Sequence, residues 1–133
     1  MSNKSKKILS EISAGELLDK ISILEIKLNK IKNKTSREKV KKEYKILIET
    51  KKSNIQINKK IQKLIKDIKY VNLNLWNIED KLRICEKNKD FGKKFVDLAR
   101  KVYFNNDKRA KIKSKINEVL GSNIREIKQY IRY

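Results

Sequence analysis

The sequence has no histidine and no proline, and its 133 residues include only three glycines and one cysteine, Cys85. Without histidine and with a single cysteine, the chain has neither the usual ligands of a zinc or haem site nor an intrachain disulfide. The scarcity of glycine and the absence of proline argue against a loop-rich β-sandwich and against a glycine-rich phosphate loop. We therefore expect neither a metal nor a cofactor.

Long apolar segments are also missing. No run of about eighteen apolar residues occurs, so we expect no segment that spans a membrane. Residues 1–7 are polar and basic, but neither a hydrophobic stretch nor the small-residue cleavage site of a secretory signal follows them. We expect a cytoplasmic protein with a flexible basic lead-in at residues 1–10 and a single domain at residues 11–133.

Basic charge is what the sequence has in excess. Lys and Arg number 36 against 16 Asp and Glu, which gives a formal net charge of +20. Such a balance is typical of proteins that bind nucleic acid. However, only six of these residues are arginine, the residue suited to bidentate contacts with phosphates and bases, and lysine is favoured by A/T-rich codons. No ladder of aromatic residues interleaves the lysines either. Nucleic-acid binding is therefore an alternative and not the favoured function.

Apolar residues recur at helical spacing through nearly the whole chain, without the alternation of strands. A capping box at residues 13–16 predicts the start of a first helix, whose narrow apolar stripe suits a coiled-coil-like seam. A second box at residues 35–38 predicts another helix. The longest helix is predicted at residues 57–86, antiparallel to the first helices, and Cys85 on its apolar stripe is expected to be buried and inert. The predicted fold class is all-α, an antiparallel helical bundle with long hairpin helices and a shorter C-terminal helical cap.

The C-terminal cap is expected to consist of short helices. It should begin near Phe91, turn at residues 105–106 and resume with Asp107 as the N-cap of a last full helix. Gly121 is in the position where glycine usually ends a helix. Residues 122–133 keep apolar residues at helical spacing, which predicts one more short helix.

Polar side chains flank the predicted apolar stripes and form the candidate site. Beside the stripe of the longest helix, one column consists of Asn72, Trp76, Glu79 and Arg83, and by itself it also fits a salt bridge at the edge of the core. The last helix carries a similar column of Arg109, Lys113 and Asn117. The first helix has Glu16, Lys20 and Lys27 on one side of its seam and Glu25 on the other. If the columns converge, Arg and Lys would bind a phosphate or carboxylate, acids and amides would bind hydroxyls, and an aromatic residue would cover a ring. The candidate ligand-binding residues are Trp76, Glu79, Arg83, Arg100, Tyr103, Asp107, Arg109 and Lys113. The same mixture would equally suit the polar rim of a helix–helix or dimer interface.

No catalytic constellation stands out in the sequence. Without histidine, a general base would have to be a carboxylate, a lysine or a tyrosine with a shifted pKa. Glu16 and Asp19, followed by Glu25, are similar to the acid pairs with which all-α nucleotide pyrophosphatases hold magnesium, but the spacing is not that family's full pattern. Lysines also lie among these acids, so a chance arrangement is favoured. The sequence predicts no metal site and neither predicts nor excludes an enzyme.

Three stretches of the chain together resemble an uncharacterised domain family of bacteria and phages. They are residues 13–27 (SAGELLDKISILEIK), residues 75–83 (LWNIEDKLR) and the polar and aromatic residues within 95–117. The closing residues also fit the family pattern, namely Gly121, Ser122, Glu126, Lys128 and Tyr130. The likeness extends over residues 11–133, although the family pattern has a second acid in this tail where the chain has Ile127. The resemblance implies gene neighbourhoods with glycosyltransferases and surface-polysaccharide genes, and a bacterial or phage-infected cell.

The polar columns and the resemblance together favour a small ligand-binding or accessory protein. The expected ligand is an anionic small molecule, such as a sugar phosphate or a nucleotide sugar. A basic nucleic-acid-binding protein is one alternative. Another alternative is a structural helical module. Its long apolar stripe would extend beyond the helices of its own chain and would pack against a second copy in a homo-oligomer. The arrangement of the polar columns in space is the observation that separates these functions.

Overall fold

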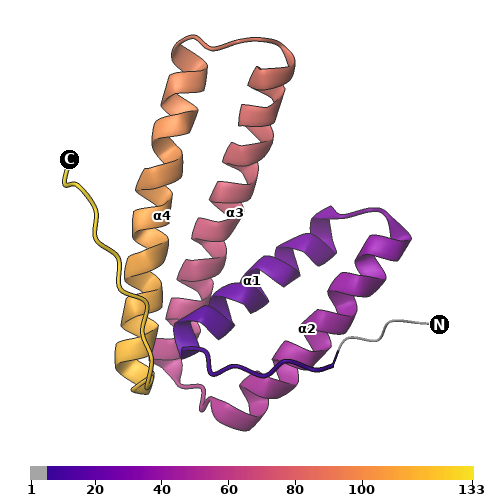
Figure 1. The fold of residues 1–133 in the computed structure, drawn as a ribbon, viewed down its shortest axis with the longest axis vertical. Helices are drawn as coiled ribbons and strands as arrows, with labels where there is room; N and C mark the ends of the chain where they lie inside the picture. The colour runs from indigo at the N-terminus through magenta and orange to yellow at the C-terminus, as the bar shows by residue number, and fades with distance from the viewer. Residues whose placement is uncertain (1–5) are drawn as a thin grey trace.

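The computed structural model describes residues 6–133, which form four α-helices and no strand (Figure 1). The helices are α1 (Ala14–Lys30), α2 (Lys34–Asn54), α3 (Lys59–Lys87) and α4 (Lys93–Leu120). The predicted all-α fold class is confirmed. Within the described part of the chain, none of the helices has the length and apolar character needed to cross a membrane. Part of the predicted flexible lead-in, residues 1–5, lies outside the described residues.

Polar side chains at the N-termini determine where the first helices begin. The Ser13 side chain caps α1, which confirms the predicted start of that helix. At α2 the Asn33 side-chain oxygen accepts a hydrogen bond from the Ser36 N–H at 2.9 Å. The predicted box at residues 35–38 therefore gave the right helix but a start that is too late, because an asparagine upstream already satisfies the first free N–H groups.

The C-terminal cap is one long helix, α4, rather than several short ones. It continues through residues 105–106, so the predicted turn there and the predicted N-cap at Asp107 are wrong. The Asn105 side chain donates to the Lys101 carbonyl oxygen at 2.8 Å, which satisfies this turn-favouring residue inside the helix. Gly121, with φ of +63°, ends α4 in the left-handed conformation, as predicted.

The predicted short helix at residues 122–133 is wrong. This C-terminal tail is irregular and runs back along α4 (Figure 1). Its Ile127 and Ile131 side chains are almost fully exposed, so no apolar stripe is buried that would stabilise a helix of this length. A polar contact holds its end instead, because the Tyr133 hydroxyl donates a hydrogen bond to the Asp107 carboxylate.

The four helices form two hairpins of unequal length (Figure 1). In the longer hairpin α3 packs along α4, and in the shorter one α2 packs against α1 and has no buried residue. The predicted antiparallel pairing of the longest helix with the first helices is wrong, because the short connection after α3 makes α4 its antiparallel neighbour. Helix α1 joins the two hairpins, since it also packs against α3 and α4.

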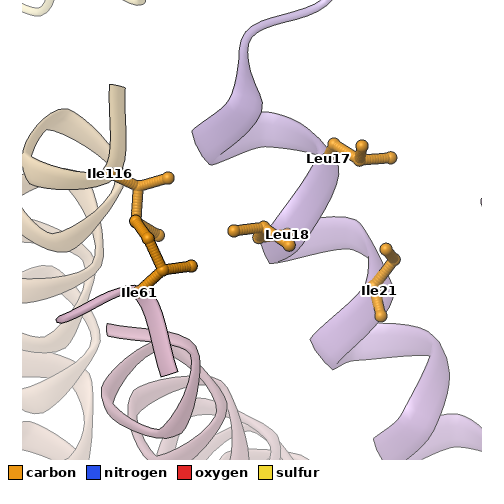
Figure 2. Close-up of a cluster of buried hydrophobic side chains, with 5 residues drawn as sticks. All are labelled: Leu17, Leu18, Ile21, Ile61 and Ile116. Atoms are coloured by element: carbon orange, nitrogen blue, oxygen red, sulfur yellow. The ribbon is translucent and has the colours of Figure 1, made fainter. Parts of the chain in front are cut away.

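Two clusters of buried apolar side chains divide the longer hairpin into two regions. We call the region around the first cluster the base; there Leu18 of α1 points toward α3 and α4 (Figure 2). The first cluster consists of Leu17, Leu18, Ile21, Ile61 and Ile116. We call residues 78–102 the distal hairpin, in which Ile78, Cys85 and Leu98 pack between α3 and α4 alone. The predicted burial of Cys85 is confirmed by an exposure of 2%.

Candidate functional site

A buried polar network crosses the base, and the Asp19 side chain, which is 1% exposed, is at its centre. Arg109 of α4 donates to both carboxylate oxygens, from Nε to Oδ1 at 2.9 Å and from Nη2 to Oδ2 at 2.5 Å. Asn72 of α3 donates from Nδ2 to the same Oδ1 at 2.8 Å and to the Ser22 hydroxyl at 2.7 Å. One carboxylate on α1 therefore joins α1 to both helices of the longer hairpin.

Lys113 extends this network toward the C-terminal tail. Its Nζ lies 2.7 Å from a Glu16 oxygen, 3.1 Å from a Glu126 oxygen and 3.8 Å from an Asp19 oxygen. Burial alone would lower the pKa of Lys113, but the hydrogen bonds to Glu16 and Glu126 outweigh burial and raise the pKa above its ordinary value. The ammonium group therefore stays charged and is committed to carboxylates of its own chain.

The partners of Asp19 also decide its charge. Burial alone would raise the pKa of Asp19, but the hydrogen bonds from Arg109 and Asn72 outweigh burial and hold the pKa below its ordinary value. The pKa of Arg109 is raised, chiefly by its hydrogen bonds to Asp19. Both oxygens of Asp19 are thus occupied by donors of the protein. Among residues 6–133 no three His, Cys, Asp or Glu side chains lie together as a set of metal ligands.

A glycine allows the first turn of α1 to approach α4 closely enough for this network to form. The Gly15 N–H donates to the Asn117 side-chain oxygen at 2.7 Å, and the Ala14 N–H donates to the Ser122 hydroxyl at 2.9 Å. A Cβ at position 15 would lie only 2.6 Å from the Lys113 carbonyl oxygen and 2.8 Å from the Asn117 oxygen. Any larger residue would therefore push α1 away from α4.

A cavity of about 470 Å³ lies beside the network, between α1, α3 and α4. It brings together four of the predicted site residues, namely Trp76, Glu79, Arg83 and Arg109. Trp76 is half-buried, whereas Glu79 and Arg83 are exposed at the mouth. The remaining lining residues are Ile23, Ile26, Asn72, Leu75 and Asp80. The column predicted on the longest helix therefore faces a cavity, and Arg109 meets it there from α4.

Arg109 also lines a second, smaller cavity of about 260 Å³ on the side of α2. The two cavities share Ile23 and Arg109, so the guanidinium group lies where they adjoin. Lys20 and Lys27 line the second cavity, and neither they nor Arg83 lie within ion-pair distance of a carboxylate among the described residues. Three acidic residues, Glu16, Asp19 and Glu43, line the second cavity as well, so it holds equal numbers of acidic and basic side chains.

The other four predicted site residues do not line either of these two cavities. They are Arg100, Tyr103, Asp107 and Lys113. Arg100 lies over the Phe104 ring at 5.6 Å, and Tyr103 packs against the rings of Phe104 and Tyr133. Asp107 and Lys113 line a third cavity of about 440 Å³ between α4 and the tail. At about 100° per residue, Arg100 and Arg109 point about 180° apart on one continuous helix, so they cannot reach the same cavity.

Sequence reasoning missed Asp19 as the centre of the network, although its signal was present. Leu18, Ser22 and Ile26 recur every four residues and form a second buried stripe on α1, beside the one that was recognised. Asp19 lies next to this stripe, where an acid has to be paired. The position of Glu126 in the tail could not be predicted from helical spacing, because the tail does not form the helix that its apolar residues predict.

The chain matches the model of a protein family. The model described as "Family of unknown function (DUF6165)" covers residues 8–132, and thus all four helices and the tail almost to its end. No curated protein and no solved structure matches the sequence. The predicted resemblance to an uncharacterised family is confirmed, while the bacterial or phage origin and the gene neighbourhood stay predictions.

Proposed function

We propose a ligand-binding function for this chain, which belongs to the family of unknown function DUF6165. The ligand would be a hydroxyl-bearing anion, a sugar phosphate or a nucleotide sugar, bound in the cavity between α1, α3 and α4. The observation that carries the proposal is the convergence of Trp76, Arg83 and Arg109 on a cavity of about 470 Å³. This volume is within the range of small-molecule sites, about 300–1,000 Å³.

The two arginines would bind the anionic group. Guanidinium groups suit phosphates because their N–H groups donate in pairs, and Arg is more weakly hydrated than Lys. Asp19 accepts from Nε and from one N–H of Nη2 of Arg109, so both N–H groups of Nη1 and the second N–H of Nη2 are left for a ligand. Arg83 has no such partner among the described residues and adds a full, exposed charge. Arg109 would thus provide a fixed contact and Arg83 an adaptable one.

The remaining side chains favour a ligand that carries hydroxyls and a ring. The Trp76 indole offers an apolar face for a sugar or a base. Glu79 and Asp80 can accept hydrogen bonds from hydroxyls, and they would repel a ligand made of phosphates alone. This argues for a sugar phosphate or nucleotide sugar and against an extended polyanion such as nucleic acid.

Titration calorimetry with glucose 1-phosphate, UDP-glucose and UMP tests the proposal. We expect at least one of the three to bind, and we expect Arg83→Gln and Trp76→Ala each to weaken that binding by about tenfold or more, equivalent to about 1.4 kcal/mol. Arg132→Gln is the matched control, since Arg132 is exposed in the tail and lines none of the cavities around Arg109. Absence of binding by all three probes, or an equal loss in the control, would contradict the proposal.

A further inference from the structure

The groove between α3 and α4 is only partly covered by the rest of the chain. At the base α1 lies against it, and Figure 1 shows that the longer hairpin extends beyond α1 and α2. There the groove continues as an open cavity of about 430 Å³. Its lining residues are Leu82, Arg83, Glu86, Phe95, Ala99 and Val102. Because Arg83 also lines the cavity beside α1, this distal groove is the continuation of the surface on which α1 packs.

The distal groove has the chemistry of a surface that packs against a helix. Four of its six lining residues are apolar, and they surround the second buried cluster, which has only two helices to cover it. Ile84, Phe91 and Val96 of the same hairpin are about half-exposed. Helical domains usually bury such faces by adding a third or fourth helix, as α1 does at the base. Among residues 6–133 no helix is left to do so here.

We infer that a second copy of this chain covers the distal groove, so that two distal hairpins form a four-helix bundle around a two-fold axis. The charges on the rim support this occupant. Arg83 and Glu86 lie one turn apart on the α3 side of the groove. Among the described residues of its own chain Glu86 has only an exposed ion pair, with Lys89 Nζ at 3.5 Å, which the contact with a second copy would replace. If two α3 helices pack antiparallel, Arg83 of one copy faces Glu86 of the other, and the reverse contact forms by symmetry.

The α3 side of the distal groove, unlike the α4 side, is balanced in charge. Residues 78–87 of α3 carry three acidic and three basic side chains, whereas residues 93–102 of α4 carry four basic side chains and one acidic side chain. Helix α2, by contrast, carries eight basic and three acidic side chains. Two copies would repel each other at α2, whereas at the distal α3 surface the repulsion is replaced by complementary pairs.

Sedimentation equilibrium of the full chain over a concentration series tests this inference. We expect a monomer–dimer equilibrium in which Ala99→Lys raises the dimer dissociation constant by about tenfold or more, because a lysine would place a charge in the apolar groove. Ala99 lines an open groove, so its lysine can extend into solvent in the monomer, and circular dichroism should show unchanged helix content. Ser53→Lys adds the same charge at the exposed end of α2 and should leave the dimer unchanged.

A charge exchange identifies the partner as a second copy. Arg83→Glu and Glu86→Arg should each weaken the homodimer, and an equimolar mixture of the two variants should dimerise again. A wild-type chain that is monomeric throughout the series overturns the inference, as does a dimer that is insensitive to Ala99→Lys and to both charge variants. Arg83 lines both the ligand cavity and the distal groove, so the ligand and the second copy compete for its guanidinium group, and Arg83→Glu tests the dimer by sedimentation only. Ala99 lies outside the ligand cavity, so Ala99→Lys should bind the sugar phosphate or nucleotide sugar at least as tightly as the wild type, and the two proposals can fail separately.

Discussion

At the base three helices meet around a buried carboxylate, whereas in the distal hairpin two helices meet around three apolar side chains. The Asp19–Arg109 pair at the base is shielded by α1, α3 and α4. The ion pair at the tip of the distal hairpin, between Lys89 and Glu86 at 3.5 Å, joins two exposed side chains. The same helices α3 and α4 form both regions, so the third helix accounts for the difference.

A third helix buries the ion pair, and burial changes both its contribution to stability and the freedom of its side chains. An exposed pair contributes about 0–1 kcal/mol, because water screens the charges and the free side chains retain their entropy. A buried carboxylate has to be paired, and its partner is then fixed in place. At the base this fixes the guanidinium of Arg109 beside the cavity between α1, α3 and α4, while the distal hairpin keeps an uncovered groove.

The largest expected effect is the loss of stability when the buried Asp19–Arg109 pair is broken, compared with the loss when an exposed ion pair is broken. Asp19→Ala should lower the free energy of unfolding by about 3–5 kcal/mol, because it leaves Arg109 without its partner. The control is Asp67→Ala on α3, since Asp67 pairs with Lys63 at 3.1 Å and the two side chains are 40% and 77% exposed. Asp67→Ala should lower the free energy of unfolding by less than about 1 kcal/mol. Urea denaturation measures both, and equal losses would contradict the proposed difference.

A smaller loss of stability is expected when a methyl group is added to a glycine at the base, where α1 approaches α4 closely. The comparison is the same substitution at the open tip of the distal hairpin. Gly15→Ala should cost about 1–3 kcal/mol, because its Cβ would meet the Lys113 carbonyl oxygen at 2.6 Å. Gly92→Ala, at the N-cap of α4, places its Cβ 3.5 Å from the nearest atom, an Asp90 oxygen. Its cost should be about 1 kcal/mol or less, because N-cap preferences typically amount to about 1 kcal/mol and no close contact is added. Thermal or urea unfolding of the two variants provides the comparison, and a larger loss for Gly92→Ala would refute it.

The helices could be predicted from the sequence because their signals are local. The Ser13 cap and the left-handed Gly121 act within one turn, and apolar periodicity marks what lies between. Residues 105–106 gave an equally local signal for a turn, and it was wrong. There α4 continues because apolar residues on both sides, such as Leu98 and Ile116, are buried in one continuous helix. The packing of α4 against α3 therefore keeps residues 105–106 helical, and a local sequence pattern does not encode that packing.

The candidate site was predictable only as far as it lies on one helix. Trp76, Glu79 and Arg83 share a face of α3, so their common position followed from helical spacing alone. Whether residues of α4 would join them depended on the register of that helix, which the false turn obscured. Because α4 is one continuous helix, its register brings Arg109 to the cavity and directs Arg100 to the opposite side. The partners of Asp19 lie 53 and 90 residues away, beyond any signal of spacing.

The smallest expected effect is the response of the base to acid. The pKa of Asp19 is lower in the folded protein than its ordinary value of 3.8, so below about pH 4 the unfolded chain takes up a proton that the folded chain does not. The stability due to Asp19 is therefore complete above about pH 4 and is lost as the pH falls through the folded pKa. Urea unfolding at a series of pH values from about pH 6 to about pH 2.5, which includes the ordinary pKa of 3.8, should show a steeper loss of stability in the wild type than in Asp19→Asn. Glu126→Gln should remove a further part of the slope, since Lys113 holds the pKa of Glu126 below its ordinary value. Identical slopes in the wild type and Asp19→Asn would show that acid acts elsewhere than at the base.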